Sequence, residues 1–228
     1  TADRIDYWEI NEAFCAVVLN CVRELAIVDE TVAAAARASG AGKGANMKLY
    51  GSQTSPYVRR IRLLLADTPY DFIKLDIFAD ADRDRLAALN PTLRIPMLED
   101  DNEVIFDSGV IYRYLAAKLA LPELSWYQEN QLTVINAVND SLVMLLQCSR
   151  SGFDTAEDKL FFNLQKERVA TCLYVLEQQA ENAEFSQWNY IAMALYSLID
   201  WTLFRQLIEL DDYPALLAFV NENAGRSG

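Results

Sequence analysis

The feature that most limits how this chain can fold is a change of pattern near residue 126. Before it, from residue 47 to about residue 122, short strand-like segments alternate with helical ones in the order β-α-β-α-β-β-α. This order predicts one small α/β domain. The predicted strands cover 47–50, 71–76, 96–99 and 104–106, and the predicted helices cover 55–66, 82–90 and 108–119.

After residue 126 the strand-like segments end, and only long helical patterns follow. They cover residues 129–150, 156–182, 189–208 and 213–224. We therefore expect an α/β domain at 47–122 that leads into an all-helical domain at 126–228.

The first 46 residues differ from both domains. Residues 1–30 carry one helical pattern, and residues 31–46 (TVAAAARASGAGKGAN) have the alanine and glycine content of a linker. The prediction for residues 1–46 is a helical extension followed by a linker.

Composition excludes several kinds of function. The formal net charge of -13 argues against a nucleic-acid partner, because an acidic chain repels phosphate backbones. The sequence contains no histidine, which removes histidine triads, histidine metal sites and histidine general bases. Chemistry must then come from hydroxyls, carboxylates, backbone dipoles or a bound cofactor, and we expect no metal.

Two further observations bear on the cellular compartment. We find no run of about 18 apolar residues that predicts a membrane-spanning helix, and no basic segment at the start that predicts a signal peptide. The four cysteines form no C-x-x-C pair and lie in apolar helical stretches, so we interpret them as core residues. We expect a cytoplasmic protein that does not act at a membrane.

Three segments, taken in order, point to a known family. The β-α-β-α-β-β-α order is that of a thioredoxin-like domain, and MKLYGSQTSPYVRRIRLLL resembles the start of bacterial, serine-type glutathione transferases. NPTLRIPMLEDDNEVIFDSGVIYRYL resembles the family's proline turn, hairpin and following helix, and YPALLAFVNENAGR resembles its closing helix. The resemblance covers residues 47–228 and implies a thioredoxin-like domain followed by an all-helical one.

The opening segment resembles something else. DRIDYWEINEAFCAVVLNCVREL, within residues 1–30, is similar to a short piece of thiolases around their WE-x-NEAF motif. The nucleophilic cysteine region and the histidine motif of thiolases are absent, so we assign no thiolase activity.

The family resemblance implies an enzyme that joins the thiol of glutathione to an electrophile. A free thiol has a pKa of about 8.5, so the site must stabilise the sulfur anion. Ser55 precedes Pro56, which favours the first helical position, and a hydroxyl at a helix N-terminus suits an anion. Taken alone, Ser55 is an ordinary N-cap. The resemblance implies that it is the catalytic serine, with Ser52 and Thr54 as competing hydroxyls.

The same resemblance implies that a proline turn binds glutathione. Ile95-Pro96 matches the family's cis-proline turn, in which the main chain of the preceding residue pairs with the cysteinyl part of glutathione. Taken alone, Pro96 is a strand-entry proline in trans. Leu93 stands where the family usually has glycine. Arg94 either reaches the glycyl carboxylate or is a solvated surface residue.

Asp107 and Ser108 open the third predicted helix, where both residue types are good caps. The resemblance implies that they hold the γ-glutamyl amine and carboxylate of glutathione. Tyr57 either lines this site or packs in the core. The electrophile pocket is expected between the two domains, beside Ser141, Met144 and Leu145.

These observations predict a serine-type glutathione transferase that uses glutathione as co-substrate, acts on small electrophiles and forms a homodimer. The alternative is a binding or scaffold protein that keeps the same fold without useful turnover, because a fold does not guarantee a function.

Overall fold

The structure is a computed structural model that describes residues 47–226. The predicted helical extension and linker lie outside the described residues. The α/β part contains, in chain order, β1 (Lys48–Gly51), α3 (Pro56–Leu64), β2 (Asp71–Lys74), α4 (Asp80–Leu89), β3 (Met97–Asp100), β4 (Glu103–Phe106) and α5 (Ser108–Lys118). The helical part contains α6 (Trp126–Arg150), α7 (Leu160–Glu181), α8 (Tyr190–Arg205) and α9 (Pro214–Asn223).

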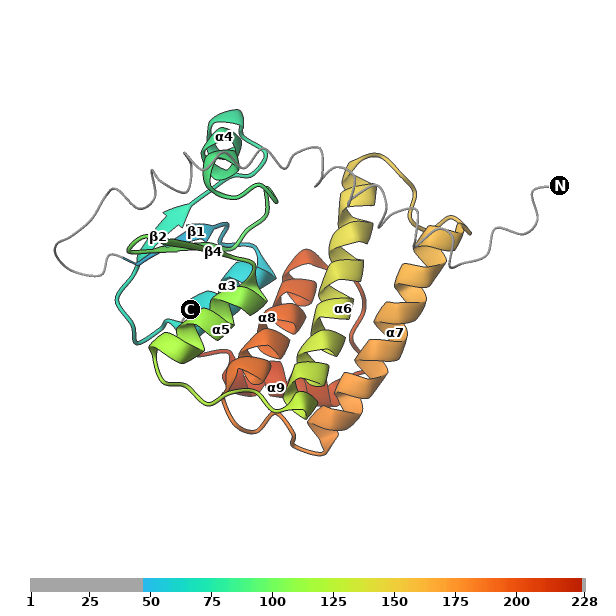
Figure 1. Cartoon of the computed structure of the whole chain (residues 1–228). Coiled ribbons are helices and arrows are strands. Elements are labelled where there is room, and N and C mark those ends of the chain that lie inside the picture. The colour runs from blue at the N-terminus through green and yellow to red at the C-terminus, as the bar shows by residue number, and fades with distance from the viewer. Residues whose placement is uncertain (1–46, 227–228) are drawn as a thin grey trace. The chain divides into compact units, whose positions relative to one another are not determined.

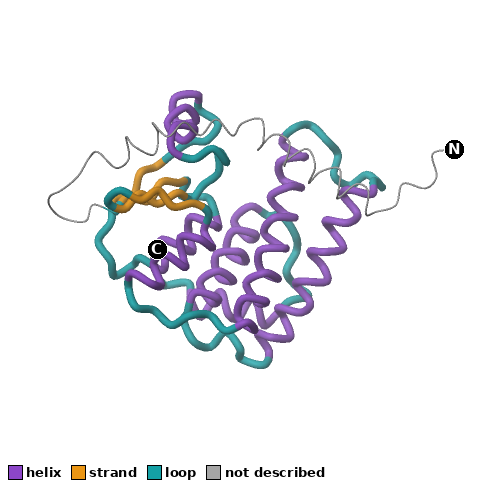
Figure 2. Tube along the Cα trace, viewed as in Figure 1, coloured by secondary structure: helices purple, strands orange, loops and turns teal. Residues whose placement is uncertain are grey.

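The strands form one mixed sheet in the order β2-β1-β3-β4. β1 pairs parallel to β2 and antiparallel to β3, and β3 pairs antiparallel to β4. Figure 2 shows this sheet as the only strand region among the described residues, with helices and the loops between them making up the rest of that part of the chain.

The two faces of the sheet bury different side chains because successive residues of a strand point to opposite sides. Leu49 and Leu98 belong to the main core, which α3 and α5 share with the helical part. Tyr50 and Met97 belong to a smaller cluster with Leu86 of α4. Figure 1 shows α4 on one face of the sheet and α3 and α5 on the other.

The start of α3 is fixed by its packing against the end of β1. A Cβ atom placed on Gly51 would lie 2.4 Å from a methyl carbon of Val58, so only glycine fits at this approach. Ser55 caps the helix, and Pro56 occupies its first turn. The N-cap residue Ser55 is therefore held next to the close contact between Gly51 of β1 and Val58 of α3.

The helical part is built around α8, whose residues from Tyr190 to Ile199 are all buried. Asn189 caps α8 by accepting hydrogen bonds from the backbone N–H groups of Ile191 and Ala192. The carboxylate of Glu177 in α7 accepts hydrogen bonds from the first backbone N–H groups of α9 and so anchors that helix.

The predicted fold class is confirmed, and each predicted strand and helix from residue 47 onward is present. The bounds differ where a local cap decides them. α6 begins at Trp126 rather than at residue 129, because Ser125 and Gln128 form a reciprocal capping box. α7 begins at Leu160 rather than at residue 156, because turns fill the preceding segment.

One helix of the described part, α6, is long and apolar enough to cross a membrane by length and composition. Core helices of soluble proteins pass the same test, and α6 has the contacts of one. It packs against α7 and α8, and its Asn136 and Asp140 bind side chains of α3. We therefore interpret α6 as a core helix of the fold.

Candidate functional site

Ser55 lies at the N-terminus of α3, and within residues 47–226 its hydroxyl donates to no acceptor. Its Oγ accepts a hydrogen bond from the backbone N–H of Val58, 3.3 Å away. A hydroxyl has one donor and two acceptor positions, so capping the helix uses only an acceptor position. The half-buried O–H group can still donate to an anion placed at the helix N-terminus.

A pocket of about 240 Å³ opens beside Ser55. Two aromatic side chains of α8 line it, Trp201, which is 6% exposed, and Phe204, which is 64% exposed. The remaining lining residues are Gln53, Thr54, Pro56, Arg59 and Asp200. The pocket therefore combines an aromatic wall with the hydroxyls of the β1–α3 loop.

An ion pair forms part of this wall. Arg59 of α3 pairs with Asp200 of α8, and each side chain is 30% exposed. The guanidinium of Arg59 also lies 5.0 Å from the ring centre of Tyr196 and donates to its hydroxyl over 3.3 Å. These contacts join the helix that carries Ser55 to the central helix of the helical part.

A second pocket, of about 500 Å³, contains four of the predicted glutathione-binding residues. Its lining residues are Asn90, Thr92, Arg94, Ile95, Pro96, Phe106, Asp107 and Val110. This volume is within the usual range of small-molecule sites. The structure thus brings the proline turn and the start of α5 together, as the resemblance implied.

The side chain of Asn90 holds the loop that leads into the proline turn. Asn90 is fully buried; its amide donates to the carbonyl oxygen of Arg94 at 2.9 Å and accepts from the backbone N–H of Thr92 at 3.0 Å. The Ile95–Pro96 peptide bond is cis, as predicted. Leu93 has φ 54°, in the left-handed region that favours glycine, which explains why glycine is the usual residue there.

Asp107 caps α5 with one carboxylate oxygen. Its Oδ1 accepts from the backbone N–H groups of Gly109 at 3.0 Å and Val110 at 3.1 Å. Within residues 47–226, its Oδ2 has no hydrogen-bond partner, and the residue is exposed, so a ligand ammonium can bind there. Ser108 is only 6% exposed, and its carbonyl oxygen accepts from the hydroxyl of Tyr190 at 3.0 Å.

Tyr57 lines neither of the two pockets and instead contacts α6. Its hydroxyl donates to Asp140 of α6, and its ring lies 5.1 Å from the guanidinium carbon of Arg60. Burial, together with the hydrogen bond and charge of Asp140, raises the pKa of Tyr57, whereas the charges of Arg60 and Arg94 act to lower it. Tyr57 is therefore a neutral hydrogen-bond donor and cannot serve as a base.

The two pockets share no lining residue among those described. Ser55 belongs to the first pocket, and Arg94, Ile95, Pro96 and Asp107 belong to the second.

Of the residues named for the electrophile pocket, Ser141 is fully buried and accepts a hydrogen bond from Arg168 at 3.2 Å, so it is a core residue. Trp201 and Phe204 were not predicted as pocket residues. The sequence feature that could have indicated them is Asp200, a charged residue inside an otherwise apolar helical segment.

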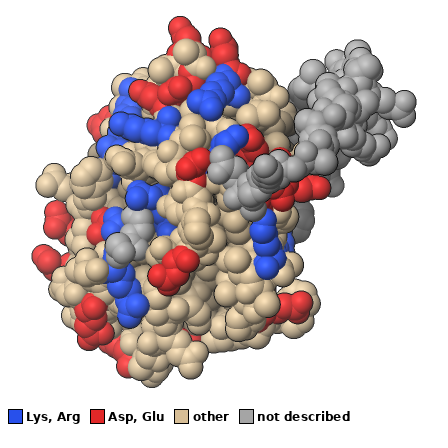
Figure 3. All heavy atoms as spheres, turned by 90° about the vertical axis from the view of Figure 1, so that its left-hand side faces the viewer, with Lys and Arg blue, Asp and Glu red and all other residues tan. Residues whose placement is uncertain are grey.

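Charge is mixed on the face of the molecule shown in Figure 3. Lysine and arginine side chains are interspersed there with aspartate and glutamate.

Within residues 47–226, no group of three histidine, cysteine or acidic side chains is placed to hold a metal ion. Cys148 and Cys172 are free thiols, and burial raises the pKa of Cys172, which makes its sulfur a poor nucleophile.

Comparison with known proteins extends these observations. A family model described as "Glutathione S-transferase, N-terminal domain" matches residues 49–123. Glutathione S-transferase 3 of Zea mays is 40% identical over 79 residues, or 33% of this chain and 36% of that protein. The chain thus spans only about a third of the length of the maize relative. The uncharacterized GST-like protein YibF of Escherichia coli is 30% identical over 142 residues, or 58% of this chain and 68% of that protein.

A solved structure agrees with the fold. The glutathione S-transferase of Methylobacillus flagellatus KT, with glutathione bound, is 22% identical and superposes with a TM-score of 0.71, covering 80% of this chain and 96% of that chain. The mixed sheet, the cis-proline turn and the helices that follow define a thioredoxin-like domain joined to an all-helical domain. On the extent of the Escherichia coli match, the chain belongs to the glutathione S-transferase family.

Proposed function

We propose that the protein is a serine-type glutathione transferase that conjugates the glutathione thiolate to small electrophiles. The observation that carries the proposal is the hydrogen-bond state of Ser55, whose oxygen caps α3 while its proton stays available. Donation from this O–H to the sulfur, aided by the helix N-terminus, favours the thiolate over the thiol. A shift of the thiol pKa by about 2 units corresponds to about 2.7 kcal/mol.

The remaining parts of the tripeptide have matching groups in the second pocket. The main chain of Ile95 pairs with the cysteinyl part, and the open carboxylate oxygen of Asp107 binds the γ-glutamyl ammonium. Arg94, which is exposed at the rim, is placed for a glutathione carboxylate. The pocket beside Ser55, with Trp201 and Phe204, receives the electrophile.

The test compares two serine caps of the same chain. Ser55→Ala and Ser125→Ala each remove an oxygen that accepts from a backbone N–H at 3.3 Å, so both lose the stability of a helix cap. We expect Ser55→Ala to bind glutathione but to lose at least about 100-fold in conjugation rate. Ser125→Ala should keep the conjugation rate of the wild type. Equal rates for the two variants would refute the catalytic role.

A second function is supported by the separation of the two pockets. Because Ser55 shares no pocket with Pro96 and Asp107, the chain can bind a ligand in the second pocket without activating a thiol in the first. That would make it a binding or scaffold protein. Calorimetric binding of glutathione by the intact protein, with no turnover against several electrophiles, is the result expected for this alternative.

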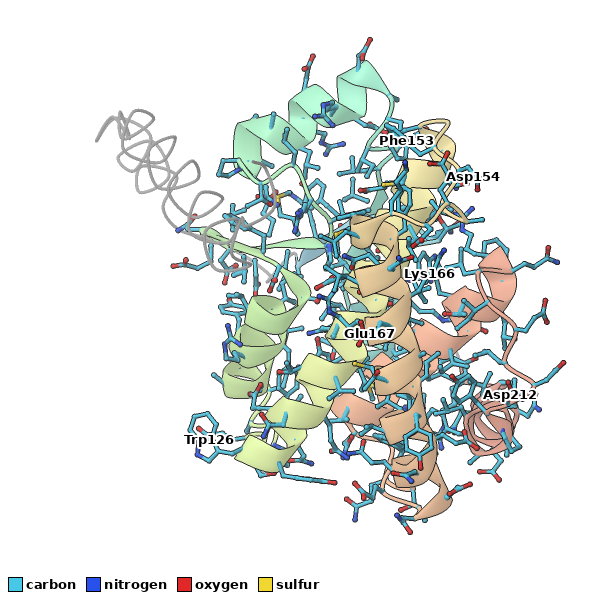
Figure 4. All side chains as sticks on the ribbon, turned by 90° about the vertical axis from the view of Figure 1, so that its right-hand side faces the viewer. Trp126, Phe153, Asp154, Lys166, Glu167 and Asp212 are labelled. Atoms are coloured by element: carbon cyan, nitrogen blue, oxygen red, sulfur yellow. The ribbon has the colours of Figure 1, made fainter. Side chains whose placement is uncertain are left out.

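We further propose that the protein is a cytoplasmic homodimer. β4 is an edge strand, and it exposes Val104, while the adjoining α5 exposes Val110. Trp126, 87% exposed, projects from the start of α6, as Figure 4 shows. Light scattering should give twice the chain mass for the wild type and a lower mass for Val110→Glu. An unchanged mass in Val110→Glu would exclude this face as the interface.

A further inference from the structure

The pocket beside Ser55 has two charged residues in its lining, and their charges are opposite. Arg59 belongs to α3 and Asp200 to α8, and their side chains form an ion pair in which each is 30% exposed. The other residues that line this pocket are uncharged. The formal charges of the lining therefore cancel only while both members of the pair are present.

Arg59 lies one helical turn after Ser55. Its backbone N–H donates to the carbonyl oxygen of Ser55 at 3.0 Å. Residues four positions apart are neighbours on a helix surface, and side chains lean toward the N-terminus of their helix. In agreement with this geometry, Arg59 and Ser55 line the same pocket. The positive charge of Arg59 therefore lies near the place proposed for the thiol sulfur.

Contacts with α8 hold the guanidinium of Arg59. Besides its ion pair with Asp200, it donates to the hydroxyl of Tyr196 at 3.3 Å and lies 5.0 Å from the ring centre of that residue. Tyr196 is only 2% exposed, so this support belongs to the core. A charge that is held partly out of water acts more strongly on a neighbouring anion than the charge of a solvated surface arginine does.

Other charged groups near α3 lie outside this lining. Asp140 of α6 accepts a hydrogen bond from Tyr57, and neither residue lines the pocket. The same holds for the remaining charged residues of α3 and of the two helices that pack against it, α5 and α8, which are Arg60, Arg62, Arg113, Lys118 and Arg205. Substituting Arg59 or Asp200 is therefore the most direct way to change the charge beside Ser55.

We propose that this ion pair sets the ionisation of the glutathione thiol at Ser55, with Arg59 favouring the thiolate and Asp200 opposing it. This inference rests on the proposed function. A positive charge near the sulfur stabilises the anion, and a negative charge destabilises it. Arg59 and Asp200 act on the sulfur through their charges, whereas Ser55 donates a hydrogen bond to it.

The test measures the thiol pKa of bound glutathione, from the ultraviolet absorbance of the thiolate across pH at saturating glutathione. We expect Arg59→Met to raise this pKa by about 0.5 to 1 and Asp200→Asn to lower it by about as much, the effect of one partly screened charge in the same pocket. A purely structural role predicts shifts in the same direction, because both variants break the same ion pair. The two signs therefore separate electrostatics from packing.

Two further measurements use the same pair. Arg59→Lys keeps the positive charge and should leave the thiol pKa within about 0.3 of the wild type. High salt should reduce both shifts, because salt screens partly exposed charges. If Arg59→Met does not fold, as judged by its thermal unfolding, Arg59→Gln replaces it. If no uncharged variant of Arg59 binds glutathione, the sign of the shift in Asp200→Asn decides the question.

Arg62→Met and Glu157→Gln are the matched controls. They change the net charge of the chain by the same amounts, but at positions outside the pocket lining. The guanidinium of Arg62 lies 4.8 Å from the ring centre of Phe72 in β2, and Glu157 forms an exposed pair with Lys159 at 3.5 Å. Each control should leave the thiol pKa within about 0.2 of the wild type.

The outcomes separate the two proposals. A wild-type protein that binds no glutathione, or in which the bound thiol keeps the pKa of about 8.5 of a free thiol, overturns the proposed function and this inference with it. If the wild type lowers the thiol pKa, but Arg59→Met and Asp200→Asn shift it in the same direction or no more than the controls do, only the role of the ion pair is overturned. Opposite shifts that shrink in high salt support it.

Discussion

The hydroxyl group of Tyr57, in the first turn of α3, donates a hydrogen bond to the carboxylate of Asp140 in α6. The contact joins the helix that begins at Ser55 to the first helix of the all-helical part. It also spans 83 positions of sequence, so it forms only when the two parts are packed together.

Removing this hydroxyl should loosen the junction between α3 and α6. We expect Tyr57→Phe to lower the free energy of unfolding by about 1–2 kcal/mol, because a hydrogen bond to a charged acceptor is lost. Denaturant titration gives the value. Tyr174→Phe is the control, since among the described residues that exposed hydroxyl bonds only to Gln178, one turn along α7. A loss no larger than that of the control would contradict the expectation.

The ion pair between Arg59 and Asp200 should make a modest contribution to stability. Both side chains are 30% exposed, so solvent screens their attraction. Asp200→Asn is expected to cost about 1 kcal/mol and to lose this effect at high salt. Glu157→Gln, which breaks the more exposed pair with Lys159, should have no measurable effect. Similar unfolding curves for Asp200→Asn and Glu157→Gln would show that packing alone holds the contact.

Leu93 is strained where the family usually has glycine. With φ 54°, a leucine at this position has a cost of about 1 kcal/mol that glycine avoids. Glycine also increases the entropy of the unfolded chain, so Leu93→Gly should range from neutral to about 1 kcal/mol more stable. Leu89→Gly, at the end of α4, should instead lose about 1 kcal/mol. Thermal unfolding of the two variants gives the comparison, and a clear loss in Leu93→Gly would contradict it.

Alkaline pH should destabilise the fold through Tyr190. Its pKa, raised by burial to about 12, lies above the ordinary tyrosine value near 10, so the folded state holds the phenol proton more tightly than the unfolded state. The resulting stability is fully present below about pH 10 and is lost as the pH rises toward 12, by roughly 2–3 kcal/mol. The unfolding free energy of Tyr190→Phe should fall less steeply across this window. If the unfolding free energies of the wild type and of Tyr190→Phe fall equally steeply with pH, Tyr190 is excluded as the group responsible.

The order of strands and helices could be predicted from the sequence because each depends on local chemistry. Short apolar segments bounded by turn residues indicate the strands, and the Ser55-Pro56 pair marks the start of a helix, as the structure confirms. The proline turn was recognised from a local motif that includes Pro96, and its cis geometry is confirmed. The roles of Ser55, Asp107 and the other site residues toward glutathione stay predictions.

The pairings between helices were decided by the tertiary structure. Arg59 with Asp200 and Arg60 with Asn136 are separated by 141 and 76 positions, and each of these side chains looks by itself like a solvated surface group. Local periodicity shows which face of a helix is apolar, but it does not show which helix lies opposite. The sequence by itself therefore determined the elements and the capped start of α3. Only packing decided that Ser55 lines the same pocket as Trp201 and Phe204 and that Arg60 is buried against Asn136, because burial and pairing depend on neighbours far away in the chain.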